Sequence, residues 1–482
     1  MTRAGTVNQP SFATGWIWLL VFLIAIAFLE SVRSGPDMPT ERMVTYSILM
    51  IVGTAALTRI CRVQKKFDPF EPVHLAFALF LVFYPIRALF AVFLDESWFD
   101  PNQRGPWIGL SAALLGYICF ALGYKFGQRS SIGLHRNWLD REWDPQKATL
   151  VSLIFLACGL AGYAVMISFG ESLFYFITLD PEVKSPEAIS PWFYYLLWVC
   201  LLIQMGALIQ VGIWLKTGKK KVWTASYCLL AMASTFFLSR YFTVLFLMML
   251  ALCWHYKKSK IRLSQVAMLL GLLVIYLGAA GVYREWISPG HTLEETKDLA
   301  EVAGQQDGLV LRYVVANLEE LGNLCDVIQM APRDLPYQIG STFTPILLKP
   351  IPRAIMASKP LGASALFTQQ TSPAAYDNGL VTALGAWGEW YLNFSWLGLI
   401  LGMALTGAAN GVAYRALWAT NEFGRILLYL SLLVVLFSWL RNDFNAATTY
   451  GLYYFLPAIV ALMIITVPEW KSPTKIGNGH AI

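Results

Sequence analysis

Long apolar runs separated by polar links extend over most of the 482-residue chain. A helix that crosses a bilayer needs about 20 mostly apolar residues. Twelve runs are candidates by this criterion: 14–32, 43–61, 73–94, 107–127, 148–169, 191–215, 222–239, 241–256, 264–283, 394–414, 425–441 and 449–468. The pattern predicts an all-α, polytopic membrane protein with about twelve transmembrane helices. The seventh and eighth runs almost touch at Ser239 and Arg240, so their link must be a tight hairpin or a partly re-entrant segment.

The distribution of Lys and Arg among the links predicts the topology. Clusters of basic residues follow the even-numbered runs, at 59–66, 125–147, 216–221, 257–262 and 415–425, whereas the short links after odd-numbered runs carry one or two each. Short cytoplasmic loops are enriched in Lys and Arg, so both termini are predicted to be cytoplasmic. The long link after the ninth run then lies on the opposite side, which in a bacterium is the periplasm or the cell exterior.

That long link divides the chain into three predicted parts. Residues 1–283 form an N-terminal membrane domain with about nine spans, residues 284–393 form one large extracytoplasmic loop, and residues 394–482 form a C-terminal membrane part of about three spans with a cytoplasmic tail. Apolar residues at helical spacing predict an amphipathic helix over about 308–330, packed on the membrane domain or lying at the interface. The many prolines of 331–377 exclude long helices there.

The composition supports membrane insertion and argues against other classes. Hydrophobic residues make up 57% of the chain and charged residues 14%, against about 25% charged residues in a soluble domain. The net charge of +6 is spread over many links, which indicates topology and not nucleic-acid binding. No His or Cys cluster has metal-ligand spacing, and only Cys325 lies in the large loop, so neither a metal site nor a disulfide framework is expected.

Several isolated arginines are candidates for binding an anionic substrate. Arg240 opens the eighth run and Arg284 follows the ninth, both on the predicted outer side, where basic residues are disfavoured. Guanidinium groups match phosphate oxygens bidentately, so two or three converging arginines would suit a diphosphate. The alternatives are a snorkelling interfacial Arg240, and an Arg284 neutralised by its neighbour Glu285.

The basic second half of the loop adds further candidates. Arg353 follows a Pro-Ile-Pro turn, with Lys349 before it and Lys359 after it. This is either a fixed cationic site or a solvated basic turn. Arg441 and Asp443 lie at the outer end of the eleventh run, where they form either a local ion pair or part of the site.

Acidic and imidazole groups are the candidate bases. Glu389 and Asn393 are four residues apart, so they share one face of a helix. Glu389 is therefore a general-base candidate or, preferably, the counter-ion that fixes an arginine. His291 is a further candidate base in the loop. His74 and His255 are expected to be structural on the cytoplasmic side.

Two further sets of residues remain open between binding and packing. Arg87 lies within the third run and is either a ligand contact or a packing ion pair. Aromatic side chains could stack on sugar rings, although anchoring at the membrane interface is the preferred role for each: Tyr337, Phe343, Trp387 and Trp390.

Taken together, these motifs resemble the Wzy-type O-antigen polymerases, which polymerise oligosaccharide repeat units of bacterial envelopes. The matching pieces are F-D-P-F-E-P (67–72), S-R (239–240), Y-R-E (283–285), I-P-R (351–353) with K-P (359–360), and G-E-W-Y-L-N-F (388–394) before a Gly-rich span. Order and spacing agree from about residue 67 to 415. The family usually has Gly where this chain has Ser395 and Tyr241, which leaves the local backbone geometry open.

The resemblance implies a glycosyltransferase of the bacterial inner membrane with a helical, GT-C-like fold. Donor and acceptor would both be polyprenyl-diphosphate-linked oligosaccharides, with no cofactor. It carries Arg240, Arg284 and Glu389 over as catalytic candidates, and Arg353, Lys359, Arg441 and Asn393 as substrate-binding candidates. Besides the lipid bilayer, the expected partners are a chain-length regulator and a flippase. Two other functions stay open: an O-antigen ligase and a twelve-span transporter or flippase of polysaccharide precursors.

Overall fold

The protein was analysed as a computed structural model that describes residues 40–62, 67–93, 104–129, 141–169, 193–236, 240–262, 264–266, 268–269, 271–272, 318–349, 351, 355–356, 358–377, 381–418 and 422–466. Within these ranges the secondary structure is helical, apart from one isolated bridge between Trp143 and Thr466. The predicted all-α class is therefore confirmed for the described part of the chain.

Eight described segments are long and apolar enough to cross a membrane. They comprise α2 (Thr40–Cys61), α3 (Pro72–Phe83) with α4 (Pro85–Phe93), α5 (Arg104–Gly127), α6 (Pro145–Phe169), α9 (Phe193–Thr217), α18 (Gly385–Trp418), α19 (Phe423–Arg441) and α20 (Phe444–Ile465). All eight coincide with predicted runs, so the prediction of a polytopic membrane protein is confirmed.

Of the remaining four predicted runs, two are helices too short to meet the criterion for a span, and two lie wholly or mostly outside the described residues. The seventh and eighth runs are shorter helices, α10 (Lys221–Phe236) and α11 (Arg240–Lys257). Run 14–32 lies outside the described residues, as does most of run 264–283. The number of twelve spans accordingly stays a prediction.

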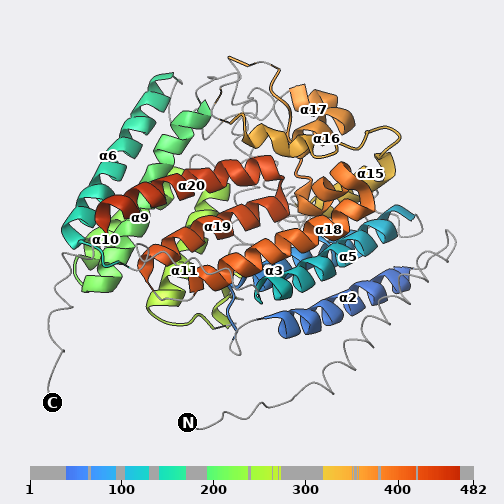
Figure 1. Cartoon of the computed structure of the whole chain (residues 1–482), viewed down its shortest axis with the longest axis horizontal. Coiled ribbons are helices and arrows are strands. Elements are labelled where there is room, and N and C mark those ends of the chain that lie inside the picture. The colour runs from blue at the N-terminus through green and yellow to red at the C-terminus, as the bar shows by residue number, and fades with distance from the viewer. Residues whose placement is uncertain are drawn as a thin grey trace, which may run out of the picture.

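The helices form two groups with a pair between them (Figure 1). On one side α2, α3 and α5 lie beside α18, with extensive packing between α5 and α18. On the other side α6 packs against α9, and α10 joins them. Helices α19 and α20 pack against each other and connect the two groups, because α19 contacts α18 and α20 contacts α6 and α9.

Glycines set the distance between α5 and α18. A Cβ atom on Gly123 of α5 would lie 2.0 Å from the carbonyl oxygen of Ala404, and one on Gly407 of α18 would lie 2.0 Å from that of Phe120. Gly127 and Gly411 repeat these contacts one turn further along. Small residues at i and i+4 let helix backbones approach closely in a membrane, where packing replaces the hydrophobic effect as the driving force.

Short helices cover one end of the bundle, as the prolines predict. They are α15 (Glu320–Met330), the 3-10 helix η3 (Ser341–Ile346), α16 (Ala363–Thr371) and α17 (Pro373–Asp377). Helix α15 begins at Glu320 and not near residue 308. Residues 318–319 are not helical, and 308–317 lie outside the described residues. Its apolar face, with Leu321, Leu324 and Val327 buried, packs on α5 and α18, as predicted.

Helix α18 is interrupted at the start of its predicted span. Phe394 and Ser395 leave helical geometry, and Ser395 has φ +58° and ψ −151°. This positive φ is a region that L-residues avoid and glycine tolerates. The resemblance had placed a family glycine at this position, so the structure gives the physical reason for one. The Ser395 hydroxyl accepts a hydrogen bond from the Tyr337 hydroxyl at 3.0 Å.

At the opposite end, the turn before α3 is held by buried carboxylates. Asp68 accepts hydrogen bonds from the hydroxyls of Tyr256 and Tyr414, each at 2.9 Å, and Glu71 accepts one from Tyr124 at 3.0 Å. His255 Nε2 lies 3.5 Å from Asp68 Oδ1. The F-D-P-F-E-P motif thus connects α3 to α5, α11 and α18. His255, which is predicted to be structural, takes part in these contacts.

We predict that replacing Gly407 with Val forces α5 and α18 apart and lowers the thermal denaturation midpoint in detergent. Overpacking of this kind costs about 1–3 kcal/mol. Gly271→Val is the matched control, because a Cβ at Gly271 meets no atom of the described residues within 4 Å. Equal midpoints for the two variants would contradict the close approach.

A second prediction isolates the backbone strain at Ser395. Both Ser395→Gly and Ser395→Ala lose the hydrogen bond from Tyr337, so the difference between them reports the positive φ alone. We expect the Gly variant to be more stable than the Ala variant by about 1 kcal/mol or more. The measurement is the denaturation midpoint of each variant in the same detergent. A more stable Ala variant would show that the residue is helical.

Candidate functional site

The hairpin between α19 and α20 is the centre of the candidate site. Helix α19 ends at Arg441 and α20 begins at Phe444, so only Asn442 and Asp443 separate them. The short helices of the large loop gather at this same end, where η3 contacts α20 and both α15 and α16 contact α18 (Figure 1). We call residues 439–445 the outer hairpin.

Glu389 joins the loop to this hairpin. Its side chain is fully buried. The Thr342 hydroxyl donates to Oε1 at 3.0 Å, while the Trp439 indole N–H and the Phe444 backbone N–H donate to Oε2 at 2.8 and 2.7 Å. A buried carboxylate is costly unless it is hydrogen-bonded, and three donors from η3, α19 and α20 meet that need. These donors are uncharged, so this geometry does not pair Glu389 with an arginine.

Asn393 continues the same connection, on the same helical face as predicted. Its amide N–H₂ donates to Thr342 Oγ1 and to the Glu389 carbonyl, each at 2.8 Å. Its Oδ1 accepts from the Gly340 backbone N–H at 2.8 Å. Every polar atom of this buried side chain is therefore engaged in holding the loop segment 338–342 against α18.

Asp443 caps α20 and holds α16. Its Oδ1 accepts from the Ala446 backbone N–H at 2.7 Å, and its Oδ2 from the Ser364 backbone N–H at 3.0 Å. The first bond is the usual helix N-cap. Gly362 fits beside it because a Cβ there would lie 2.7 Å from Oδ2. Of the two alternatives for Arg441 and Asp443, the local ion pair is not formed, because the carboxylate of Asp443 accepts from backbone donors.

Arg441 pairs instead with α15. Its Nε lies 3.7 Å from Oε1 of Glu320, and the Arg441 side chain is 33% exposed whereas that of Glu320 is 1% exposed. Burial raises the pKa of Glu320 to about 7, although Arg441 opposes this shift. Arg87 lies on the inner side of the same cluster and donates from Nε to the Leu318 carbonyl at 2.9 Å. Arg87 is buried, so of its two interpretations the structure favours packing.

The beginning of α11 packs on α19 and α20 next to the outer hairpin. Tyr241 and Ser438 share a short hydrogen bond between their hydroxyls, and the Tyr241 ring lies 5.0 Å from that of Tyr450. Helix α11 starts at Arg240, which places the backbone of this predicted residue close to the end of α19. The Arg240 side chain lies outside the described residues.

Lys349 is a second cation at the hairpin. Its ammonium donates to the Asn445 carbonyl and to the Thr449 hydroxyl of α20. Burial lowers the pKa of Lys349 to about 7, and the negative charge of Asp443 opposes that shift. The positive charge of Lys359 also lowers the pKa of Lys349. Lys359, a further predicted residue, is therefore close enough to Lys349 for their charges to interact. The Lys359 ammonium itself donates to the Ile351 carbonyl at 3.4 Å.

Aromatic rings form a wall beside these groups. Phe343 lies 5.0 Å from Trp390 and 5.3 Å from Phe444, and Trp439 lies 4.8 Å from Phe444, measured between ring centroids. Trp387 is different, because it is fully buried and its indole N–H donates to the Ala113 carbonyl at 3.0 Å. Trp387 is therefore a core residue, and both predicted roles for it, sugar stacking and interface anchoring, are wrong.

The structure thus brings together Glu389, Asn393, Arg441 and Lys349, and sets Lys359 in electrostatic range. Arg284, Arg353 and His291 lie outside the described residues. The sequence analysis missed Thr342, Trp439 and Glu320. A polar or acidic residue within apolar surroundings is the signal that could have identified Glu320. In the described ranges, no group of three or more His, Cys, Asp or Glu side chains is placed to hold a metal ion.

The arrangement offers a partly exposed guanidinium, a titratable ammonium and an aromatic wall at one end of a membrane bundle. Comparison with known proteins bears on what this end does. No curated protein and no solved structure matches the chain. The model of the family described as O-antigen polysaccharide polymerase Wzy matches residues 323–471, a stretch that contains α16, α18, the outer hairpin and α20. The motifs at 67–72, 239–240 and 283–285 lie outside this match. The resemblance is therefore confirmed over residues 323–471, where a Wzy O-antigen polymerase family domain is found.

Proposed function

We propose that the protein polymerises polyprenyl-diphosphate-linked oligosaccharide repeat units by glycosyl transfer at the outer-hairpin end of its membrane domain. The family domain supports an O-antigen polymerase role in general. The charge asymmetry of the links supports a periplasmic position for this end, cytoplasmic termini and insertion in the inner membrane. The product would be O-antigen or exopolysaccharide.

The observation that carries the proposal is the setting of Arg441. It lies on the outer hairpin within the family domain and is one-third exposed, and it is oriented by a buried carboxyl of α15. An arginine held in this way is a preorganised phosphate ligand. The start of α11 beside the hairpin would add Arg240 to the same site. Arg284 and Arg353 are further proposed ligands.

The reaction assigns a role to these cations. When the glycosidic bond of the donor breaks, negative charge develops on the departing lipid diphosphate. Fixed cations in a partly dry site stabilise that charge in the transition state. Arg441 and Lys349 would supply part of the positive charge, with Lys359 beyond them. The aromatic wall of Phe343 and Trp390 would contact sugar rings.

Glu389 acts in this proposal as a positioning residue. Its carboxylate is buried and accepts three hydrogen bonds, from Thr342, Trp439 and Phe444. Through these bonds it sets the angle at which the hairpin presents Arg441. Asn393 supports the loop in the same way. Deprotonation of the acceptor hydroxyl would then be the task of another group, such as His291 or Asp443.

Two alternatives share parts of this evidence. An O-antigen ligase uses the same type of donor with a different acceptor, and a transporter or flippase of precursors shares the many spans. A chain-length regulator and a flippase stay as predicted partners of the polymerase.

The family domain favours polymerisation. The polysaccharide pattern of a deletion strain distinguishes a polymerase, a ligase and a transporter. Loss of a polymerase leaves single repeat units on the final carrier. Loss of a ligase leaves long chains on the lipid, and loss of a transporter removes surface units.

We predict that a deletion strain complemented with Arg441→Ala makes single-unit polysaccharide, with at least about 100-fold less polymer per protein molecule. Loss of one preorganised donor costs about 10²–10³ in rate. Arg333→Ala is the matched control, because Arg333 is an exposed arginine of the large loop that also pairs with a carboxylate, that of Asp334. Polymer length is measured on gels and protein amount by immunoblot. Normal long chains with Arg441→Ala would refute the site.

The rate of polymerisation should depend on pH through the ionisation of Lys349. Because its pKa is lowered to about 7, the ammonium loses its charge as the pH rises from 6 to 8, and polymerisation in isolated membranes should fall with a midpoint near 7. Above pH 7 the unfolded chain binds more protons at this lysine than the folded protein, so this group makes stability rise with pH. The titration of Lys349 therefore does not itself destabilise the protein over this range, and the amount of folded protein is measured at each pH because Glu320, whose pKa is raised to about 7, acts in the opposite direction.

Lys349→Arg is the informative variant, because arginine keeps its charge over this range. We expect the fall between pH 6 and 8 to disappear in this variant while the amount of protein in the membrane stays normal. An unchanged pH profile in Lys349→Arg would remove Lys349 from the substrate site and leave the role of Arg441 intact.

A further inference from the structure

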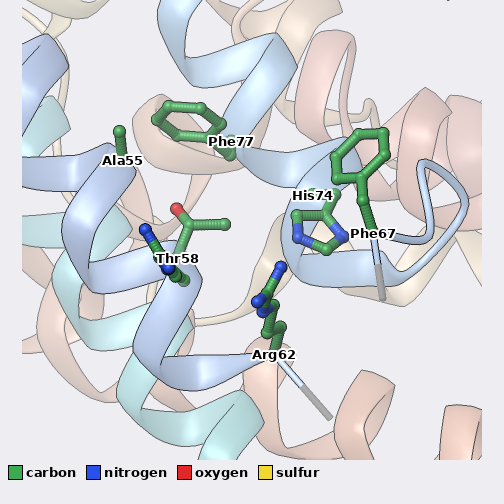
Figure 2. Close-up of a pocket in the computed structure, with 7 residues that line it drawn as sticks. Ala55, Thr58, Arg62, Phe67, His74 and Phe77 are labelled. Carbon is green, nitrogen blue, oxygen red and sulfur yellow. The ribbon is translucent and has the colours of Figure 1, made fainter. Parts of the chain in front are cut away.

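A hollow of about 330 Å³ lies between α2 and α3, at the end of the bundle away from the outer hairpin. It is formed by the last turns of α2, the turn before α3 and the first turns of α3 (Figure 2). Its lining consists of Ala55, Thr58, Arg59, Arg62, Phe67, His74 and Phe77. A volume of this size falls in the range of about 300–1,000 Å³ that is usual for small-ligand pockets.

The polar side of this hollow is cationic. Arg59 and Arg62 are three residues apart at the end of α2, and both line the space. The guanidinium of Arg62 points into the region between Thr58 and His74 (Figure 2). His74 Nδ1 lies 2.6 Å from the carbonyl oxygen of Asp68, which can only accept, so Nδ1 is the donor and the ring orientation is fixed.

Within the part of the chain that the structure describes, Arg59 and Arg62 form no ion pair with the carboxylates of the turn before α3. Asp68 and Glu71 are 1% and 0% exposed. Tyrosine hydroxyls of α11, α18 and α5 donate to them. The hollow therefore presents positive charge to whatever enters it.

An apolar stripe continues from the hollow along α2. Ile48, Val52, Ala55, Arg59 and Arg62 follow one another at intervals of four, three, four and three residues, so they lie on one face of the helix. Ile48 and Val52 are 49% and 61% exposed. Inorganic phosphate has no apolar part that could contact this stripe, whereas the acyl chain of a phospholipid would lie along it.

We propose that the hollow between α2 and α3 binds an anionic phospholipid, with the phosphate between Arg59 and Arg62 and an acyl chain along Ala55, Val52 and Ile48. Basic pockets between transmembrane helices bind anionic headgroups in this way, and arginine matches the phosphate oxygens bidentately. The link after α2 is on the predicted cytoplasmic side, so the ligand belongs to that leaflet. The proposal is independent of the reaction at the outer hairpin.

Native mass spectrometry of the detergent-solubilised full chain tests it, with phosphatidylglycerol, phosphatidylcholine, polyprenyl phosphate and inorganic phosphate as separate probes. We expect the wild type to bind one phosphatidylglycerol at least tenfold more tightly than phosphatidylcholine or polyprenyl phosphate, without competition from millimolar inorganic phosphate. Arg59→Gln with Arg62→Gln should weaken phosphatidylglycerol binding at least tenfold. Lys219→Gln with Arg262→Gln removes two exposed charges from the same predicted side and should leave it unchanged.

A second variant tests the shape of the site without changing its charge. Ala55→Trp fills the hollow from an exposed position of α2 and should displace the lipid while both arginines remain. Several outcomes would overturn the proposal. They are equal affinities of the two double variants, equal affinities for the two phospholipids, tighter binding of polyprenyl phosphate that Arg59→Gln with Arg62→Gln weakens, displacement by inorganic phosphate, and retained lipid in Ala55→Trp.

Discussion

The buried carboxylate of Glu389 is the constraint on which the candidate site depends. Placed among apolar helices, it must collect hydrogen-bond donors, and it takes them from three elements that are distant in sequence: η3, the end of α19 and the beginning of α20. Satisfying one group therefore fixes the loop, the hairpin and the first part of α18 in one arrangement. Asn393 and Asp443 extend the same principle with backbone donors of their own.

The bundle supplies a rigid frame for this arrangement. Close contact between α5 and α18 through glycines fixes the part of α18 that follows the interruption at Ser395. At the other end, tyrosine hydroxyls converge on Asp68 and Glu71 and tie three helices, α5, α11 and α18, to the turn before α3. Both ends thus use the same physical device, a buried carboxylate satisfied by neutral donors. They differ in their cations, since Arg441 and Lys349 belong to the first end, and Arg59 and Arg62 to the second.

Much of the fold followed from hydrophobic pattern, because length and polarity of the runs suffice to identify spans such as α5 and α20. The structure of the large loop was harder to predict from the sequence. The prolines correctly excluded long helices, but the start of α15 at Glu320 depends on packing that periodicity does not report. For the site, spacing alone placed Glu389 and Asn393 on one face. The partners Thr342, Trp439 and Glu320 come from three separate segments, and only the tertiary fold brings them together. Trp387 was misassigned because composition does not distinguish an interfacial ring from a core ring.

The two-residue connection between α19 and α20 limits how this end of the bundle can move. Arg441 and the N-cap residue Asp443 are tethered so closely that neither can shift without carrying the end of a long helix with it. The hairpin is therefore a fixed part of the site and does not open or close by itself. On the proposed function, a new repeat unit or an elongated chain would be accommodated by movement of the segments packed on the hairpin, through the contacts of Ser364 with Asp443 and of Glu320 with Arg441.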